Sequence, residues 1–223
     1  MRVYLPPTCR KKSFVLLYGM VIFSFLLFPL AFLFFFQKKI SVALIGMLTA
    51  VVLCSLQLFF ALNTPFENSS FVAYFFENWF SLFCVPLFLY SVLQCALVKQ
   101  LNFCFDDVLP FVLSFFTICY PFLLFLQPRP YSFFLLFVKP VLLLGAFFLL
   151  QRVLQKTYVL LGERKLCWIG SGVLALLCSF FEPFVETIWY FALLPAFVWI
   201  VFSVVFLSLS LGLFLGVSKK FAN

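Results

Sequence analysis

Long apolar runs are the feature that most constrains how this chain can fold. Seven runs reach or approach the roughly 20 residues that a helix needs to cross the hydrocarbon core of a bilayer. They cover residues 14–36, 40–62, 79–98, 108–126, 131–150, 166–184 and 187–217. Backbone N–H and C=O groups find no water partners in lipid, so an open chain crosses it only as helices. The sequence therefore predicts an all-α polytopic transmembrane helix bundle.

The composition argues against a separate soluble domain. Only 10% of the residues are charged, against about 25% in ordinary soluble domains. No polar stretch is long enough to fold by itself, so we expect a single integral membrane domain over residues 1–223. The net charge of +8 is spread over short clusters between the runs, which favours contact with anionic lipid headgroups over nucleic-acid binding.

The basic residues predict an orientation. The loops after odd-numbered runs and the end of the chain contain Lys38, Lys39, Lys99, Arg152, Lys156, Arg164, Lys165, Lys219 and Lys220. The loops after even-numbered runs contain only Arg129. Positive loops stay on the cytoplasmic side, so we expect the C-terminus in the cytoplasm. The charge bias is typical of a plasma membrane protein, and of the bacterial inner membrane in particular.

The first run leaves the number of spans open. If residues 14–36 span the bilayer, the chain has seven spans, and its N-terminal basic residues lie on the side that the charge rule disfavours. If this run is re-entrant or interfacial, six spans remain and the charge rule is obeyed. The run is apolar all round, which favours spanning, and the other six runs keep their orientation in both cases.

Lys139 is the only charged residue in FFLLFVKPVLLLGAFF, residues 133–148. A charge near the middle of a bilayer costs a few kcal/mol or more and is by default a candidate functional residue. One alternative is snorkelling, although the outer edge lies about 12 Å away and a lysine stem covers roughly half of that. The other is an internal partner. Pro140 also frees the carbonyl of Leu136, which the ammonium or a neighbouring helix can satisfy.

Two glutamates are candidate partners for Lys139. Residues 166–181 give a helix of about 24 Å, too short for a 30 Å core. Extending that helix through EPFV brings Glu182 into the outer leaflet, so Glu182 is the first candidate and Glu186 the second. The pair either only fixes helix register or lines a polar cavity and is broken and remade as a solute passes. Arg129, in QPRPY, either attracts an anion near Lys139 or lies among headgroups.

Three further patterns concern packing and contacts. Residues 151–165 predict a short interfacial helix on anionic lipid, or a docking element for a cytosolic or membrane partner. FCVPLFLY at 83–90 resembles FVKPVLLL at 137–144, a weak internal repeat. Small residues at four-residue spacing allow close helix contacts or an oligomer. They are Ser171, Ala175 and Ser179, and Ser208, Gly212 and Gly216.

The chain lacks the usual signs of catalysis. It has no histidine, and none of its eight cysteines forms a CxxC pair. No nucleophile elbow, zinc motif or phosphate-binding loop occurs. We therefore expect no enzyme, catalytic residue, metal or cofactor. The favoured function is a small permease or a membrane subunit of a solute transport system, with Lys139, Glu182, Glu186 and Arg129 as candidate site residues. The alternative is a non-catalytic membrane scaffold or assembly factor.

Overall fold

The protein is all-helical throughout the part of the chain that the structure describes. The computed structural model describes residues 7–36, 39–61, 70–90, 92, 107–126, 132–161, 179–191 and 194–218, and none of these forms a strand. The elements are α1 (Pro7–Phe36), α2 (Ile40–Ala61), α3 (Phe71–Trp79), the π-helical η1 (Phe80–Cys84), α5 (Val108–Leu126), the π-helical η3 (Phe134–Val138), α6 (Lys139–Leu161), α8 (Phe181–Phe191) and α9 (Ala196–Ser218).

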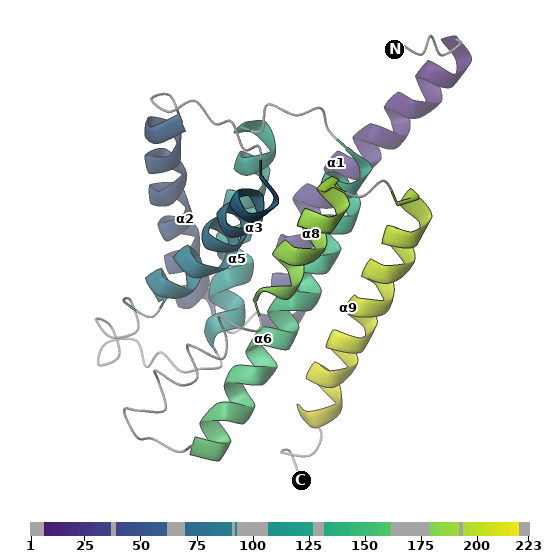
Figure 1. Cartoon of the computed structure of the whole chain (residues 1–223). Helices are drawn as coiled ribbons and strands as arrows, with labels where there is room; N and C mark the ends of the chain where they lie inside the picture. Colours follow the sequence, from purple (N-terminus) through teal and green to yellow (C-terminus); the bar gives the residue numbers. More distant parts are fainter. Residues whose placement is uncertain are drawn as a thin grey trace.

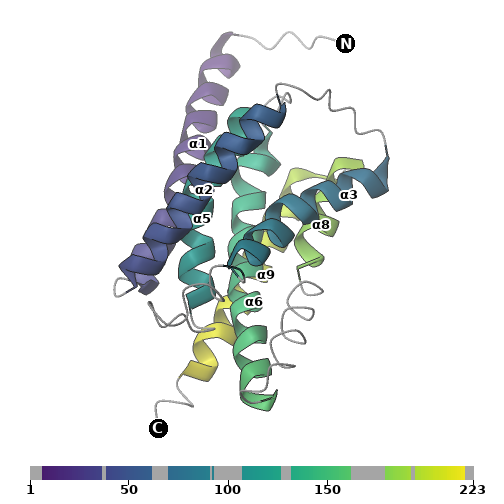
Figure 2. The same cartoon turned by 90° about the vertical axis from the view of Figure 1, so that its left-hand side faces the viewer.

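Helices α2, α5, α6 and α9 follow one another across the bundle, and α1 also packs on α5 (Figure 1). The short helices α3 and α8 lie side by side (Figure 2). The core is centred on α5 and α6, since 89% of an apolar 18-residue window within Phe134–Lys156 is buried inside the bundle. By contrast, only 17% of the corresponding 18-residue window within Ala196–Gly216 of α9 is buried. Helix α9 thus presents an apolar outer surface of the kind that lipid covers.

Three described helices are long and apolar enough to cross a membrane: Val108–Phe125, Phe134–Lys156 and Ala196–Gly216. Two shorter apolar stretches, Tyr18–Leu33 and Ile40–Leu56, belong to α1 and α2. The predicted all-α class and the membrane character are in agreement with this architecture. The predicted run at 166–184 lies outside the described residues up to position 178, and the run at 79–98 lies outside them at position 91 and from 93 onward.

The last predicted run, 187–217, is longer than a bilayer requires, so it must tilt, kink near Pro195 or extend past the bilayer, and the structure divides it into two helices. Helix α8 ends at Phe191 and α9 begins at Ala196, so the predicted boundary between the sixth and seventh runs falls inside α8. Pro195 explains the break, because its ring fits the start of a helix and its missing N–H prevents continuation of a preceding one. The Val198 N–H donates to the Pro195 carbonyl at 3.1 Å, which begins the new helix.

The predicted interfacial helix at 151–165 is also wrong as a separate element. Helix α6 continues without a break to Leu161, and residues 162–165 lie outside the described part. Gln151 and Arg152 are buried rather than on a lipid surface. The reason is a polar contact that sequence periodicity does not reveal: the Leu109 N–H, in the first turn of α5, donates to Gln151 Oε1 at 3.0 Å.

Close packing relies on glycines other than the predicted ones. A Cβ built at Gly46 would lie 2.6 Å from the Phe111 carbonyl oxygen, so α2 touches α5 there. A Cβ at Gly145 would lie 2.8 Å from the Phe206 ring, which fixes α6 against α9. At Gly212 and Gly216 a Cβ would meet nothing within 4 Å, and Ser208 is exposed. In the other predicted set, Ser171 and Ala175 lie outside the described residues.

Candidate functional site

The candidate site begins with a local distortion before Pro140. Residues Phe134–Val138 form a π-helical segment, in which the Lys139 N–H donates to the Phe134 carbonyl five residues earlier. Pro140 has no N–H and its ring clashes with the carbonyl four residues back, so the helix widens there. The same geometry recurs at Phe80–Cys84, ahead of Pro86, where the Val85 N–H donates to the Phe80 carbonyl. The two segments of the weak sequence repeat thus share a local backbone conformation.

The π segment places two side chains toward α8. Residues five apart on an ideal α-helix differ in direction by about 140°, but an i→i+5 hydrogen bond brings them onto one face. Phe134 stacks on Trp189 with ring centroids 4.1 Å apart. Lys139, five residues on, forms an ion pair with Glu186, its Nζ 2.8 Å from Oε1. These two contacts set the register of η3 and α6 against α8.

Hydroxyl groups satisfy the carbonyls that the distortion leaves free. The Ser24 hydroxyl, on α1, donates to the Leu136 carbonyl, and the Tyr120 hydroxyl, on α5, donates to the Leu135 carbonyl. The expectation that a neighbouring helix satisfies the carbonyl freed by Pro140 is confirmed. These bonds hold α1 and α5 to the segment that carries Lys139.

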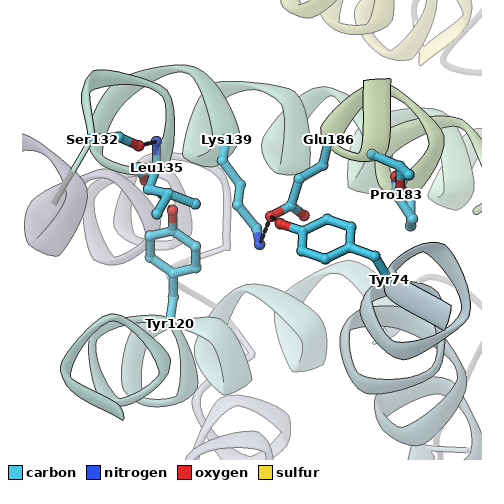
Figure 3. Close-up of polar contacts among 8 residues, drawn as sticks. Tyr74, Tyr120, Ser132, Leu135, Lys139, Pro183 and Glu186 are labelled. Atoms are coloured by element: carbon cyan, nitrogen blue, oxygen red, sulfur yellow. Dashed lines mark hydrogen bonds and ion pairs between the residues drawn. The ribbon is translucent and has the colours of Figure 1, made fainter. Parts of the chain in front are cut away.

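Lys139 has an internal partner and does not snorkel. Its side chain is 4% exposed and that of Glu186 is fully buried. The Tyr74 hydroxyl donates to the same carboxylate oxygen, Oε1 of Glu186, at 3.2 Å (Figure 3). The first-ranked partner, Glu182, is therefore wrong for the direct contact, and the second candidate, Glu186, makes it. The cause is the register set by the π segment and by Trp189, which sequence length alone does not show.

Glu182 lies one helical turn before Glu186, so both carboxylates are on the same side of α8. Its side chain is fully buried, and within the described part of the chain neither of its carboxylate oxygens has a hydrogen-bond partner. Oε2 of Glu186 likewise has none among the described residues. Glu182 is close enough to Glu186 and Lys139 to interact with their charges. We call Lys139, Glu182 and Glu186 the buried charge cluster.

Aromatic contacts hold α3 over this cluster. Tyr74 stacks on Tyr190 with centroids 4.5 Å apart, and Trp79 stacks on Phe180 at 4.4 Å. The Trp79 Nε1–H donates to Ser179 Oγ at 2.8 Å. Tyr74 was missed from sequence because it precedes the apolar run at 79–98. The aromatic segment FVAYFFENW is the only local signal that could have drawn attention to it.

Other polar residues lie elsewhere. Arg129 is outside the described residues. In the described part, Lys39 forms an ion pair with Asp107, which immediately precedes α5. Arg152 Nη1 donates to Gln155 Oε1 at 2.8 Å, while its Nε and Nη2 have no hydrogen-bond partner. No group of three or more potential metal-ligating His, Cys, Asp or Glu side chains occurs among the described residues.

No protein-family model matches the chain, and no significant match exists among curated proteins or solved structures. The function must therefore be inferred from the chemistry of the site. The buried charge cluster combines one ammonium and two carboxyl groups in an apolar bundle, and the Tyr74 phenol donates to one of these carboxyl groups. It contains no activated nucleophile, but it can bind and release a proton or a polar group.

Proposed function

We propose that this chain is a multi-pass membrane protein that moves a polar solute, as a small permease or as a membrane subunit of a transport system. The observation that carries the proposal is the unsatisfied part of the buried charge cluster. A buried ion pair that only fixes packing needs its remaining oxygens hydrogen-bonded, because desolvating them is costly. Here three carboxylate oxygens, both of Glu182 and one of Glu186, are buried without a hydrogen-bond partner among the residues that the structure describes.

The positions of the start of the first helix and the end of the last helix favour an odd number of membrane spans. Helix α1 begins and α9 ends at opposite ends of the bundle (Figure 1). Together with the positive-inside rule, this favours seven spans, an external N-terminus and a cytoplasmic C-terminus. The plasma membrane, and the bacterial inner membrane in particular, is the location that this charge pattern fits.

The proposed mechanism uses exchange of partners within the cluster. A solute bearing a carboxylate would compete with Glu186 for the Lys139 ammonium, and one bearing an amine or hydroxyl group would donate to the free oxygens of Glu182. The first exchange replaces one buried hydrogen bond by another, and the second gives a donor to oxygens that have none in the described part of the chain. Arg129 remains a candidate for attracting an anionic solute at the outer surface.

The test compares a neutralised cluster with an unrelated charge change. Lys139→Met/Glu186→Gln removes both charges of the pair together, a replacement that buried pairs commonly tolerate without loss of stability. Lys156→Met, an exposed lysine further along the same helix, is the matched control. Both variants should be monodisperse in detergent. In a deletion strain, the control should restore growth and the intracellular solute profile, and the double variant should restore neither. If the double variant restores both fully, the Lys139–Glu186 pair serves only packing, and the transport proposal is wrong.

A membrane scaffold or assembly factor is the second candidate, and one observation favours it. The face of α9 that carries Ser208, Gly212 and Gly216 is open, and small residues of this spacing let two helices approach closely in lipid. A second copy of the chain is the proposed occupant. Gly212→Val should then lower the dimer fraction in crosslinking of native membranes. An unchanged fraction would count against this candidate.

A further inference from the structure

The charges of the cluster do not balance unless it holds a proton. The Lys139–Glu186 pair is neutral as a unit. An ionised Glu182 would add an uncompensated negative charge in a fully buried position, where a lone carboxylate is so costly that the group instead takes up a proton. No described residue donates a hydrogen bond to Glu182, which agrees with this, since a buried carboxylate normally collects several donors.

The charged and titratable groups around the two glutamates come from four of the described helices. Helix α6 contributes Lys139 and α8 contributes Glu186, whose Oε1 is occupied by Lys139 and Tyr74. Helix α3 contributes Tyr74. Helix α5 contributes Tyr120, whose hydroxyl donates to the Leu135 carbonyl. Of the described basic side chains, Lys139 alone forms an ion pair with either glutamate.

We propose that Glu182 and Glu186 form a one-proton site with Lys139 as their shared counter-ion, and that the proton is the coupling ion of the transport described above. The site rests on the geometry of the cluster. Only its use as a coupling ion rests on the proposed function. Glu182 carries the proton while Glu186 pairs with Lys139.

Release of the proton changes the partners of Lys139. When Glu182 loses its proton to water, two carboxylates compete for one ammonium. Lys139 then divides its hydrogen bonds between Glu186 and Glu182, which lie one helical turn apart on α8. The ion pair between Lys139 and Glu186 therefore weakens. Proton uptake restores the single pair. One proton enters or leaves, and no covalent bond other than O–H changes.

The experiment uses dicyclohexylcarbodiimide, an apolar reagent that reacts with protonated carboxyl groups. The carboxyl proton moves to a reagent nitrogen, the carboxylate oxygen adds to the central carbon, and rearrangement leaves a stable N-acylurea that contains the whole reagent. Purified full-length protein in detergent is labelled at pH 7, and the modified residue is located by fragment mass spectrometry. We expect labelling at Glu182 and not at Glu186, with labelling falling as the pH is raised.

Variants give a pattern that a purely structural glutamate would not produce. Glu182→Gln should abolish labelling in the cluster. Glu186→Gln should at least halve labelling at Glu182, because the carboxylate then becomes the only counter-ion of Lys139. Lys139→Met should add labelling at Glu186, which loses its cation. If Glu186→Gln does not fold, the double variant Lys139→Met/Glu186→Gln, with no ammonium to neutralise, should label Glu182 fully.

Two outcomes separate the proposals. Folded protein in which Glu182 stays unlabelled at pH 7, or labelling that is indifferent to Glu186→Gln, would overturn the one-proton site and leave solute transport untouched. The expected labelling pattern in a chain whose neutralised double variant still restores growth would establish the proton site and refute transport through the cluster.

Discussion

Replacing Lys139 by methionine tests how strongly the buried pair holds the bundle together. The change keeps most of the side-chain volume but removes the ammonium that binds Glu186 at 2.8 Å. Among the described residues, the Tyr74 hydroxyl at 3.2 Å is then the remaining hydrogen-bond donor to Glu186, and Glu182 gains no donor. Because an uncompensated buried charge remains, we expect the free energy of unfolding to fall.

The magnitude follows from comparable buried pairs. Removing one partner of a buried ion pair costs about 3–5 kcal/mol, whereas replacing both partners by neutral groups is often harmless. A change of 1 kcal/mol shifts Tm by about 2–4 °C in a domain of this length, so the single variant should lose roughly 6–20 °C. Lys139→Met/Glu186→Gln should recover to within about 1 kcal/mol of the original protein.

Two cysteines provide the readout. Cys54 and Cys119 are free and buried, so in a background whose other six cysteines are replaced by alanine, a dye that becomes fluorescent on reaction with thiols reports when the bundle opens. The proteins are heated in detergent at pH 8. Equal Tm values for the original protein and Lys139→Met at pH 8 would refute the energetic role of the pair.

Two further predictions concern packing and topology. Gly46→Val should lower the free energy of unfolding by about 1–3 kcal/mol, because it overfills the contact between α2 and α5. Gly212→Val, at an open position, should leave the Tm of the isolated protein unchanged. Thermal unfolding of the two variants measures this difference. A reporter enzyme that is active only in the cytoplasm should be active when fused after residue 223. If a periplasm-specific reporter is active at that point instead, the predicted cytoplasmic position of the C-terminus is wrong.

The sequence was sufficient for the fold class, because the apolar runs obey a length constraint that holds wherever lipid is the solvent. It also identified Lys139 and its two candidate partners, since a charge among apolar residues is visible without a structure. It did not rank the partners correctly. Glu186 and Glu182 differ by one turn of the same helix, and helix length alone cannot resolve such a register.

The remaining errors have a similar origin. The run from 187 to 217 is apolar throughout, so only Pro195 marked the change from α8 to α9. Arg152 was assigned to a lipid surface because sequence gives no view of the α5 terminus beside Gln151. The small-residue set of α9 stays a prediction of an oligomer contact, whereas the close contacts of Gly46 and Gly145 depend on the facing helix and have no sequence pattern.

The two π segments have a mechanical consequence. Each accommodates one residue more than an α-helix of the same length, so conversion to α-helix would rotate one side of the helix against the other by about 100° and shift it by about 1.5 Å. Both donors to Glu186 belong to helices of this kind: Lys139 directly follows η3, and Tyr74 lies on α3, which runs into η1. A one-residue screw step at either segment would carry a donor away from the carboxylate without unfolding a helix.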